Sequence, residues 1–159
     1  MGFFIGAGLI LTQGDKFVLI KEVRNEKAEL YNLPAGTLEV GEDLIACITR
    51  EAKEETGADI TLECLVGIYQ TVIGSGSNVL FTIFAGSTPI NTVFHSEEHD
   101  SIEALAYEQI VALDKAGKLR APTILKAIND YRAGRKLPLS AVQSWHIDEL
   151  ASITVGKDH

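Results

Sequence analysis

Residues 36–58 read GTLEVGEDLIACITREAKEETGA, and this stretch indicates how the rest of the chain is built. In its second half, apolar side chains recur with the i, i+3, i+7 spacing of one helical face: Ile45, Ile48 and Ala52. Gly57 follows at the position where a glycine commonly ends a helix. The sequence therefore predicts a helix from Asp43 to Thr56.

Three acidic residues of this helix share one face. Glu51, Glu54 and Glu55 lie at i, i+3 and i+4, so their carboxylates fall within one turn of each other. They also occupy the last turns, where the helix dipole favours cations, and each like-charge pair costs about 0.2 to 0.5 kcal/mol. A hard divalent cation is the simplest compensation for this cluster. The spacing alone leaves open a solvated acidic face, partly neutralised by Arg50 and Lys53.

Segments rich in β-branched and aliphatic residues flank the helix on both sides and predict strands. The predicted strands cover residues 4–12, 17–23, 30–33, 60–73 and 79–85. Residues 86–101 read as a long polar loop, and residues 102–113 fit either a strand or a helix. A second helix is predicted over residues 122–133, between a proline at its start and a glycine after its end.

The bulk composition indicates one globular domain over residues 1–159, with a C-terminal end that lacks periodicity and is expected to be mobile. The chain is 46% hydrophobic and has a formal net charge of −8, which argues against a nucleic-acid polymer as partner. A small anionic substrate would therefore need a basic pocket or a bound metal ion.

The location of the protein is expected to be the cytoplasm. The apolar start of the chain has no basic region before it and is far shorter than the roughly 20 residues that span a bilayer, so no membrane attachment is expected. Cys47 and Cys64 show neither CxxC spacing nor a nearby His, which favours buried free thiols over a zinc site or a disulfide. Free thiols fit a reducing compartment.

The opening stretch also carries a family motif. It gives Gly36, five residues, Glu42, seven residues, and then the run from Arg50 to Ala58, REAKEETGA. This resembles the Nudix box, G-x5-E-x7-R-E-U-x-E-E-x-G-U, with every polar and glycine position matched and Ala at both aliphatic positions. The resemblance implies the Nudix fold, an α+β architecture in which a mixed β-sheet lies between helices as α/β/α layers.

The resemblance also implies a reaction, the hydrolysis of a phosphoanhydride bond in a small diphosphate by metal-activated water. Family residues that would hold Mg²⁺ or Mn²⁺ correspond to Glu51, Glu54, Glu55 and the carbonyl of Ala35. Among these, Glu51 is the first choice as general base.

Four further positions of the box have supporting roles under the same resemblance. Arg50 would orient Glu51 and offset its charge, and Glu42 would support the cluster by hydrogen bonding or through a second metal. Gly36 is expected to let the backbone turn sharply before the helix, and Gly57 to end the helix.

A distant loop offers another source for the base, because a loop glutamate takes that role in several Nudix branches. The loop candidates, otherwise solvated charges, are Glu97, Glu98, Asp100 and Glu103. His95 and His99 stand four residues apart, but on a loop this spacing does not indicate a zinc site.

Outside the box, LRAP at residues 119–122 and YRAGRKLPL at residues 131–139 are similar to motifs of bacterial NudJ-type phosphatases. This branch implies nucleoside di- and triphosphates or thiamine-type pyrophosphates as substrates. Arg120 and Arg135 are candidate phosphate contacts, with ordinary surface charge as the alternative. Tyr31 is a candidate for stacking on a substrate ring, with a core tyrosine as the alternative.

Three questions stay open at this level. The box is shared by Nudix enzymes for ADP-ribose, dinucleoside polyphosphates and oxidised nucleotides, so the substrate class is not determined. A catalytically silent binding module usually loses box glutamates, which this chain retains. The oligomeric state is also open, and a homodimer is one alternative.

Overall fold

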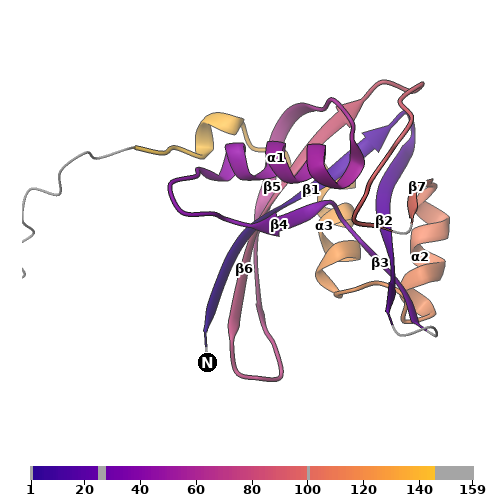
Figure 1. Ribbon diagram of the computed structural model, residues 1–159, viewed down its shortest axis with the longest axis horizontal. Coiled ribbons are helices and arrows are strands. Elements are labelled where there is room, and N and C mark those ends of the chain that lie inside the picture. The colour runs from indigo at the N-terminus through magenta and orange to yellow at the C-terminus, as the bar shows by residue number, and fades with distance from the viewer. Residues whose placement is uncertain (1, 25–27, 100, 146–159) are drawn as a thin grey trace, which may run out of the picture.

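The computed structural model describes residues 2–24, 28–99 and 101–145 (Figure 1). Seven strands are formed: β1 Phe3–Gln13, β2 Lys16–Arg24, β3 Ala28–Asn32, β4 Ala35–Thr37, β5 Thr61–Val72, β6 Asn78–Thr88 and β7 Ser101–Leu105. The helices are α1 Leu44–Thr56, α2 Tyr107–Lys115, α3 Thr123–Arg132 and the 3-10 turn η1 Leu139–Ala141. All five predicted strands and both predicted helices are therefore present.

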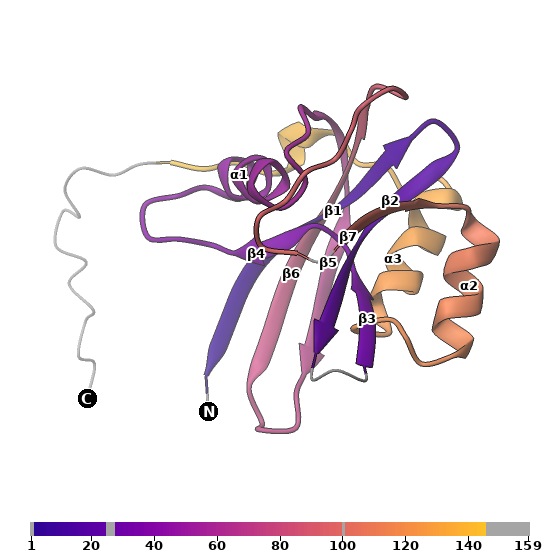
Figure 2. The same cartoon turned by 45° about the vertical axis from the view of Figure 1, so that its right-hand side comes forward.

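The strands form one mixed sheet, whose main path runs β3-β2-β1-β6-β5. The long central strands β1 and β6 are parallel, whereas the other pairs are antiparallel. In Figures 1 and 2, α1 lies on one side of the sheet and α2 and α3 lie on the other. This arrangement confirms the predicted α+β fold with a sheet between helices.

Each face of the sheet has its own apolar core. Under α1, the fully buried Ile48 and Ala52 pack against Leu9 and Phe84 of the central strands. On the other face, the helices contribute the buried residues Ile110, Ile124, Ala127 and Ile128. Because side chains alternate along a strand, β1 and β6 supply buried apolar residues to both cores.

Helix α1 has a defined start and end. Asp43 precedes the helix, and its carboxylate accepts a 2.8 Å hydrogen bond from the Ala46 N–H. Gly57 ends it in the left-handed conformation with φ of +67°. A Cβ atom at Gly57 would also lie 2.8 Å from the His95 carbonyl oxygen, so the site requires glycine on two grounds. The predicted helix boundaries are confirmed.

Two segments differ from expectation or resolve an open alternative. Residues 35–37, which lie outside the predicted strands, form the short strand β4 and pair with β1 from Gly8 back to Gly6. Three residues are too few to show periodicity, so this strand depends on its partner. Residues 102–113, which fitted either a strand or a helix, contain the end of β7 and most of α2.

Cys47 and Cys64 are free and buried, as predicted. Within the described ranges, no helix combines the length and apolar character needed to cross a membrane. The tail is attached to the sheet through two hydrogen bonds between Leu65 and Leu137, with N···O distances of 2.9 and 2.8 Å. Residues 146–159, where a mobile end was expected, lie outside the described residues.

Candidate active site

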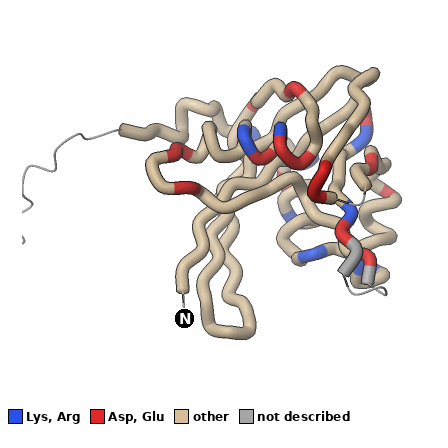
Figure 3. The backbone as a smooth tube through the Cα atoms, in the orientation of Figure 1, with Lys and Arg blue, Asp and Glu red and all other residues tan. Residues whose placement is uncertain are grey.

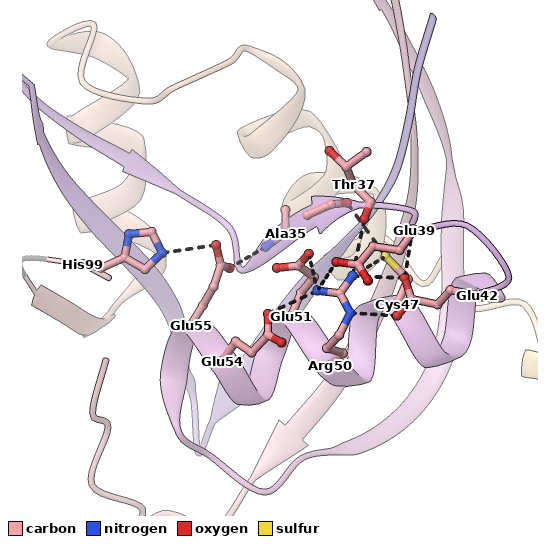
Figure 4. A network of polar contacts seen from close by, with 11 residues as sticks. Ala35, Thr37, Glu39, Glu42, Cys47, Arg50, Glu51, Glu54, Glu55 and His99 are labelled. Carbon is pink, nitrogen blue, oxygen red and sulfur yellow. Dashed lines mark hydrogen bonds and ion pairs between the residues drawn. The ribbon is translucent and has the colours of Figure 1, made fainter. Parts of the chain in front are cut away.

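Arg50 is the centre of the acidic cluster on α1 (Figure 4). Its Nε and Nη2 atoms donate to the two oxygens of Glu42, at 2.8 and 3.0 Å. Its Nη1 atom donates to Glu51 at 2.8 Å and to Glu54 at 3.1 Å. One guanidinium therefore joins three carboxylates, and its contact with Glu51 fits the predicted orienting role.

Glu42 lies in the loop before α1 and has both oxygens engaged. The hydrogen bonds from Arg50 lower the pKa of Glu42 to about 2, and the Glu39 N–H, at 3.1 Å, acts in the same direction. The carboxylates in turn raise the pKa of Arg50. This geometry fits the hydrogen-bonding alternative for Glu42 better than a second metal site.

Gly36 is required for a different reason from the one expected. It lies inside β4, and the glycines with positive φ do not include it. A Cβ atom added to Gly36 would lie 1.9 Å from the Cδ and Oε1 atoms of Glu51. The expectation of a sharp turn at Gly36 is therefore wrong. The residue is small because the Glu51 carboxylate lies directly against the backbone of β4.

Glu55 points away from Arg50 and is buried between β4 and a distant loop. One oxygen accepts a 2.8 Å hydrogen bond from the Ala35 N–H, and the other lies 3.1 Å from His99 Nε2. Burial raises the pKa of Glu55 to about 7, although both partners act in the opposite direction. His99 is thus part of the site. Its spacing from His95 did not predict this role, because only the tertiary structure brings His99 to α1.

The donor set can be tested against a divalent cation. Among the described residues, no three His, Cys, Asp or Glu side chains stand in the geometry of a metal cage. Arg50 lies between Glu51 and Glu54, and Glu55 is directed at the Ala35 N–H.

The chemistry of the donors nevertheless fits such an ion. Three carboxylates lie on one helical face, and the side chain of Glu54 is 49% exposed and therefore accessible from solvent. The high pKa of buried Glu55 also indicates a carboxylate whose charge lacks full compensation. A cation would supply that compensation.

The loop after β6 reaches this site, and the His95 N–H donates to the Thr56 carbonyl at 3.0 Å. Glu97 and Glu98 are exposed on this loop, and Asp100 lies outside the described residues. Glu103 was placed with the loop acids, but it belongs to β7, which pairs with β2. There it accepts a 3.3 Å hydrogen bond from the Tyr31 hydroxyl.

A pocket of about 470 Å³ opens next to the glutamates. Its aromatic lining is Tyr69 and Phe81, and Asn32 and Arg120 are among its polar lining. Ala35 connects the two features, because it lines the pocket and donates its N–H to Glu55. The pocket is therefore placed to receive the organic part of a molecule whose phosphates reach α1.

The residues predicted to contact the substrate lie in different places in the structure. Arg120 lines the pocket, whereas Arg135 lies 3.5 Å from the carboxylate of Asp130. Asp130 accepts a 2.8 Å hydrogen bond from Tyr69, so Arg135 is connected to the pocket indirectly. Tyr31 is 7% exposed and packs in the core, as the alternative for that residue had it. Tyr69 was not identified from the sequence, because tyrosine on a strand is usual.

Comparison with known proteins agrees with this geometry. Residues 2–127 match the family described as NUDIX domain. The chain belongs to the Nudix family. Phosphatase NudJ of Escherichia coli strain K12 is 30% identical over 128 residues, which cover 80% of this chain and 82% of NudJ.

Solved structures show the same fold. A Nudix hydrolase from Nitrosomonas europaea is similar with a TM-score of 0.75 and 30% identity, covering 89% of this chain and 97% of that one. A MutT protein from Methanosarcina mazei is similar with a TM-score of 0.69 and 19% identity, covering 84% and 96%. At 19% identity, the second likeness supports the fold alone.

Membership in the Nudix family makes the chain a hydrolase of phosphoanhydride bonds, a pyrophosphohydrolase or phosphatase. Nudix hydrolases generally use divalent metal ions and act on small phosphate compounds. The Nudix box spans Gly36 to Ala58, which in the structure is β4, the loop after it, α1 and its end. The motif therefore coincides with the Arg50 network.

Proposed function

We propose that this Nudix hydrolase cleaves a phosphoanhydride bond in a nucleoside di- or triphosphate or a related pyrophosphate, with Mg²⁺ or Mn²⁺ as cofactor. The observation that carries the proposal is the position of Ala35. Its N–H meets the carboxylate of Glu55 at 2.8 Å, and the same residue lines the pocket. A substrate in that pocket would thus present its phosphates to the α1 glutamates.

The residues proposed to hold the cation are Glu51, Glu54, Glu55 and the carbonyl of Ala35, because hard cations prefer oxygen ligands. When bound, the ion lowers the pKa of water and neutralises charge on phosphate oxygens. Glu51 acts as general base and accepts a proton from the attacking water. Arg50 holds the Glu51 carboxylate in place through its 2.8 Å hydrogen bond.

The pocket supports a substrate with one base or similar aromatic group. Its volume of about 470 Å³ is in the range of small-ligand sites, and a dinucleoside polyphosphate would leave its second base outside. Arg120 is the one Lys or Arg among the lining residues, which favours a contact with a phosphate. Tyr69 and Phe81 offer aromatic surfaces for the ring.

The remaining features of the proposal follow from composition. We propose that residues 1–159 form one Nudix domain that acts in the cytoplasm on a small molecule. The formal net charge of −8 disfavours attraction to nucleic-acid polymers.

The test is release of phosphate or pyrophosphate from nucleoside di- and triphosphates, thiamine pyrophosphate and ADP-ribose, with Mg²⁺, with Mn²⁺ and with chelator. We expect metal-dependent turnover, highest on a nucleoside di- or triphosphate or a related pyrophosphate. The matched control is Glu108→Gln, which removes an exposed carboxylate from α2 and should leave turnover unchanged. Turnover that persists in chelator, or that is absent on all substrates, would contradict the proposal.

A further inference from the structure

The starting half of β1 and the β5–β6 hairpin extend together beyond α1 (Figures 1 and 2). The register shows which side chains share a face there. Phe3 pairs with Asn78, which pairs with Val72, and Ile5 pairs with Leu80. Directly paired residues point to the same side of a sheet. The register thus assigns each side chain of this extension to one of its two faces.

The face directed to the side of α1 is mostly apolar, and the described residues leave it largely uncovered. Ala7, the next residue in the alternation from Phe3 and Ile5, is buried beneath α1 and pairs through Thr82 with Ile68. We call this uncovered surface the open face; it consists of Phe3, Ile5, Ile68, Val72 and Leu80. Phe3 is 83% exposed, Ile5 is 47% exposed, and Ile68 and Val72 are each 64% exposed.

The extension also carries no charged side chain. Residues 1–14 and 64–96 contain no Asp, Glu, Lys or Arg, in a chain that is 23% charged. Figure 3 shows the consequence, because the whole extension lacks acidic and basic residues. Edge strands normally carry Lys, Glu or Pro to prevent pairing, and the edge strand β5 has none from residue 64 to its end at Val72. No charged side chain of the extension would therefore oppose its association with another surface.

From these observations we infer that the open face is the interface of a homodimer, in which it packs against the open face of a second copy. Two copies that each carry a formal charge of −8 repel one another, so a neutral surface is where they can approach. A two-fold axis would place the apolar side chains of one open face against those of the other. An anionic membrane or a nucleic acid would require basic residues, which these strands lack.

The composition of the open face is compatible with this occupant. A stable interface buries about 800 Å² on each partner around an apolar centre with a polar rim. Large apolar patches on monomers seldom exceed about 600 Å² and are often functional. The five side chains would form the apolar centre, and the amides of Gln70 and Asn78, hydrogen-bonded to each other at 3.0 Å, would lie among them.

The experiment is analytical ultracentrifugation of the full chain over a range of concentrations and salt. We expect a monomer–dimer equilibrium that tightens as salt rises, because screening reduces repulsion between the two negative chains. Ile68→Lys and Val72→Lys should each raise the dimer dissociation constant about tenfold or more, since a charge would be buried at the centre. Ile90→Lys, which changes a residue 80% exposed outside the face, is the matched control and should leave association unchanged.

A further variant guards against loss of folding. Gln70→Glu adds one charge at an exposed position in the row of Ile5 and Leu80, and it should weaken the dimer without changing the melting temperature. A wild-type chain that stays monomeric at high concentration and high salt would overturn the inference. Lysine variants that dimerise as the wild type does would also overturn it.

Discussion

Helix α1 and the extension formed by β1, β5 and β6 differ most in charge. At α1, one arginine is shared by three carboxylates, and a fourth, on Glu55, is buried with its pKa raised to about 7. Across the extension, residues 64–96 contain no acidic or basic residue. Both regions adjoin the same strands, so the difference in charge does not arise because one region is more deeply buried than the other.

The contrast shows how one chain separates two tasks. Clustered carboxylates cost free energy, and a cation compensates for it, so α1 suits polyanion chemistry. Exposing an uncharged apolar sheet to water is unfavourable, and burial against another apolar surface removes this cost. Three variants of the site follow in order of decreasing expected effect on turnover, and a fourth tests the pKa of Glu42.

Glu51→Gln should have the largest effect. It removes the proposed base while keeping nearly the same shape, and general bases typically contribute about 10²- to 10⁴-fold to the rate. We expect kcat to fall by at least about 100-fold. Steady-state kinetics with Mg²⁺ measure this, with Glu108→Gln as the control. A loss of less than about tenfold would place the base elsewhere.

Gly36→Ala should come next, because its Cβ atom would lie 1.9 Å from the Glu51 carboxylate. We expect turnover to fall about 10- to 100-fold and the free energy of unfolding to fall by about 1 to 3 kcal/mol, as for other overpacked sites. Gly74→Ala is the control, since no atom lies within 4 Å of its added Cβ. Equal behaviour of the two variants in activity and denaturant titration would refute the steric argument.

Tyr69→Ala should have a smaller effect, confined to substrate binding. Removing the ring from the pocket should raise KM about tenfold for a substrate with an aromatic ring, as expected for about 1.4 kcal/mol of lost contact. Methyl diphosphate, which has no ring, should be unaffected if it is turned over. Tyr69→Phe keeps the ring and loses the hydrogen bond to Asp130, so its KM should lie between those of the wild type and Tyr69→Ala. A fall in kcat with KM unchanged would contradict a binding role.

Arg50→Gln should raise the pKa of Glu42. Because Glu42 stays ionised at neutral pH with either pKa, the effect of this shift there should be small. The hydrogen bonds from Arg50 hold the pKa of Glu42 at about 2, and without them it should return towards its ordinary value near 4.5. A depressed pKa in the folded state contributes stability above the unfolded value, and this contribution is lost as pH falls from about 4.5 to about 2. Carboxyl-detected NMR titration of the metal-free protein measures the shift. An unchanged titration of Glu42 would show that Arg50 does not cause the low pKa of this residue.

Much of the site could be predicted because it is local. The spacing of Glu51, Glu54 and Glu55 depends only on helical periodicity, and Asp43 and Gly57 define the helix ends through local hydrogen bonds and backbone conformation. The five predicted strands followed from local β-branched and aliphatic composition, and all are present. The Nudix box added the identity of the family to this local reading.

The remaining features needed the folded chain. Strand β4 exists because β1 pairs with it, and Gly36 is small because a side chain from α1 lies on it. His99 reaches Glu55 from 44 positions away, and Tyr69 belongs to the site because of the pocket it lines. The assignment of Glu103 to a loop failed for the same reason, since β7 forms by pairing with β2.

The amino-acid order alone therefore specified the catalytic helix and its acidic face, because these depend on interactions between neighbours in the chain, and the resemblance to the Nudix box implied the mixed α+β architecture. Folding in three dimensions selected which distant groups meet those glutamates, where the pocket opens and which apolar strands stay uncovered. These outcomes depend on contacts between residues far apart in the chain, and such contacts leave no periodic trace in the sequence.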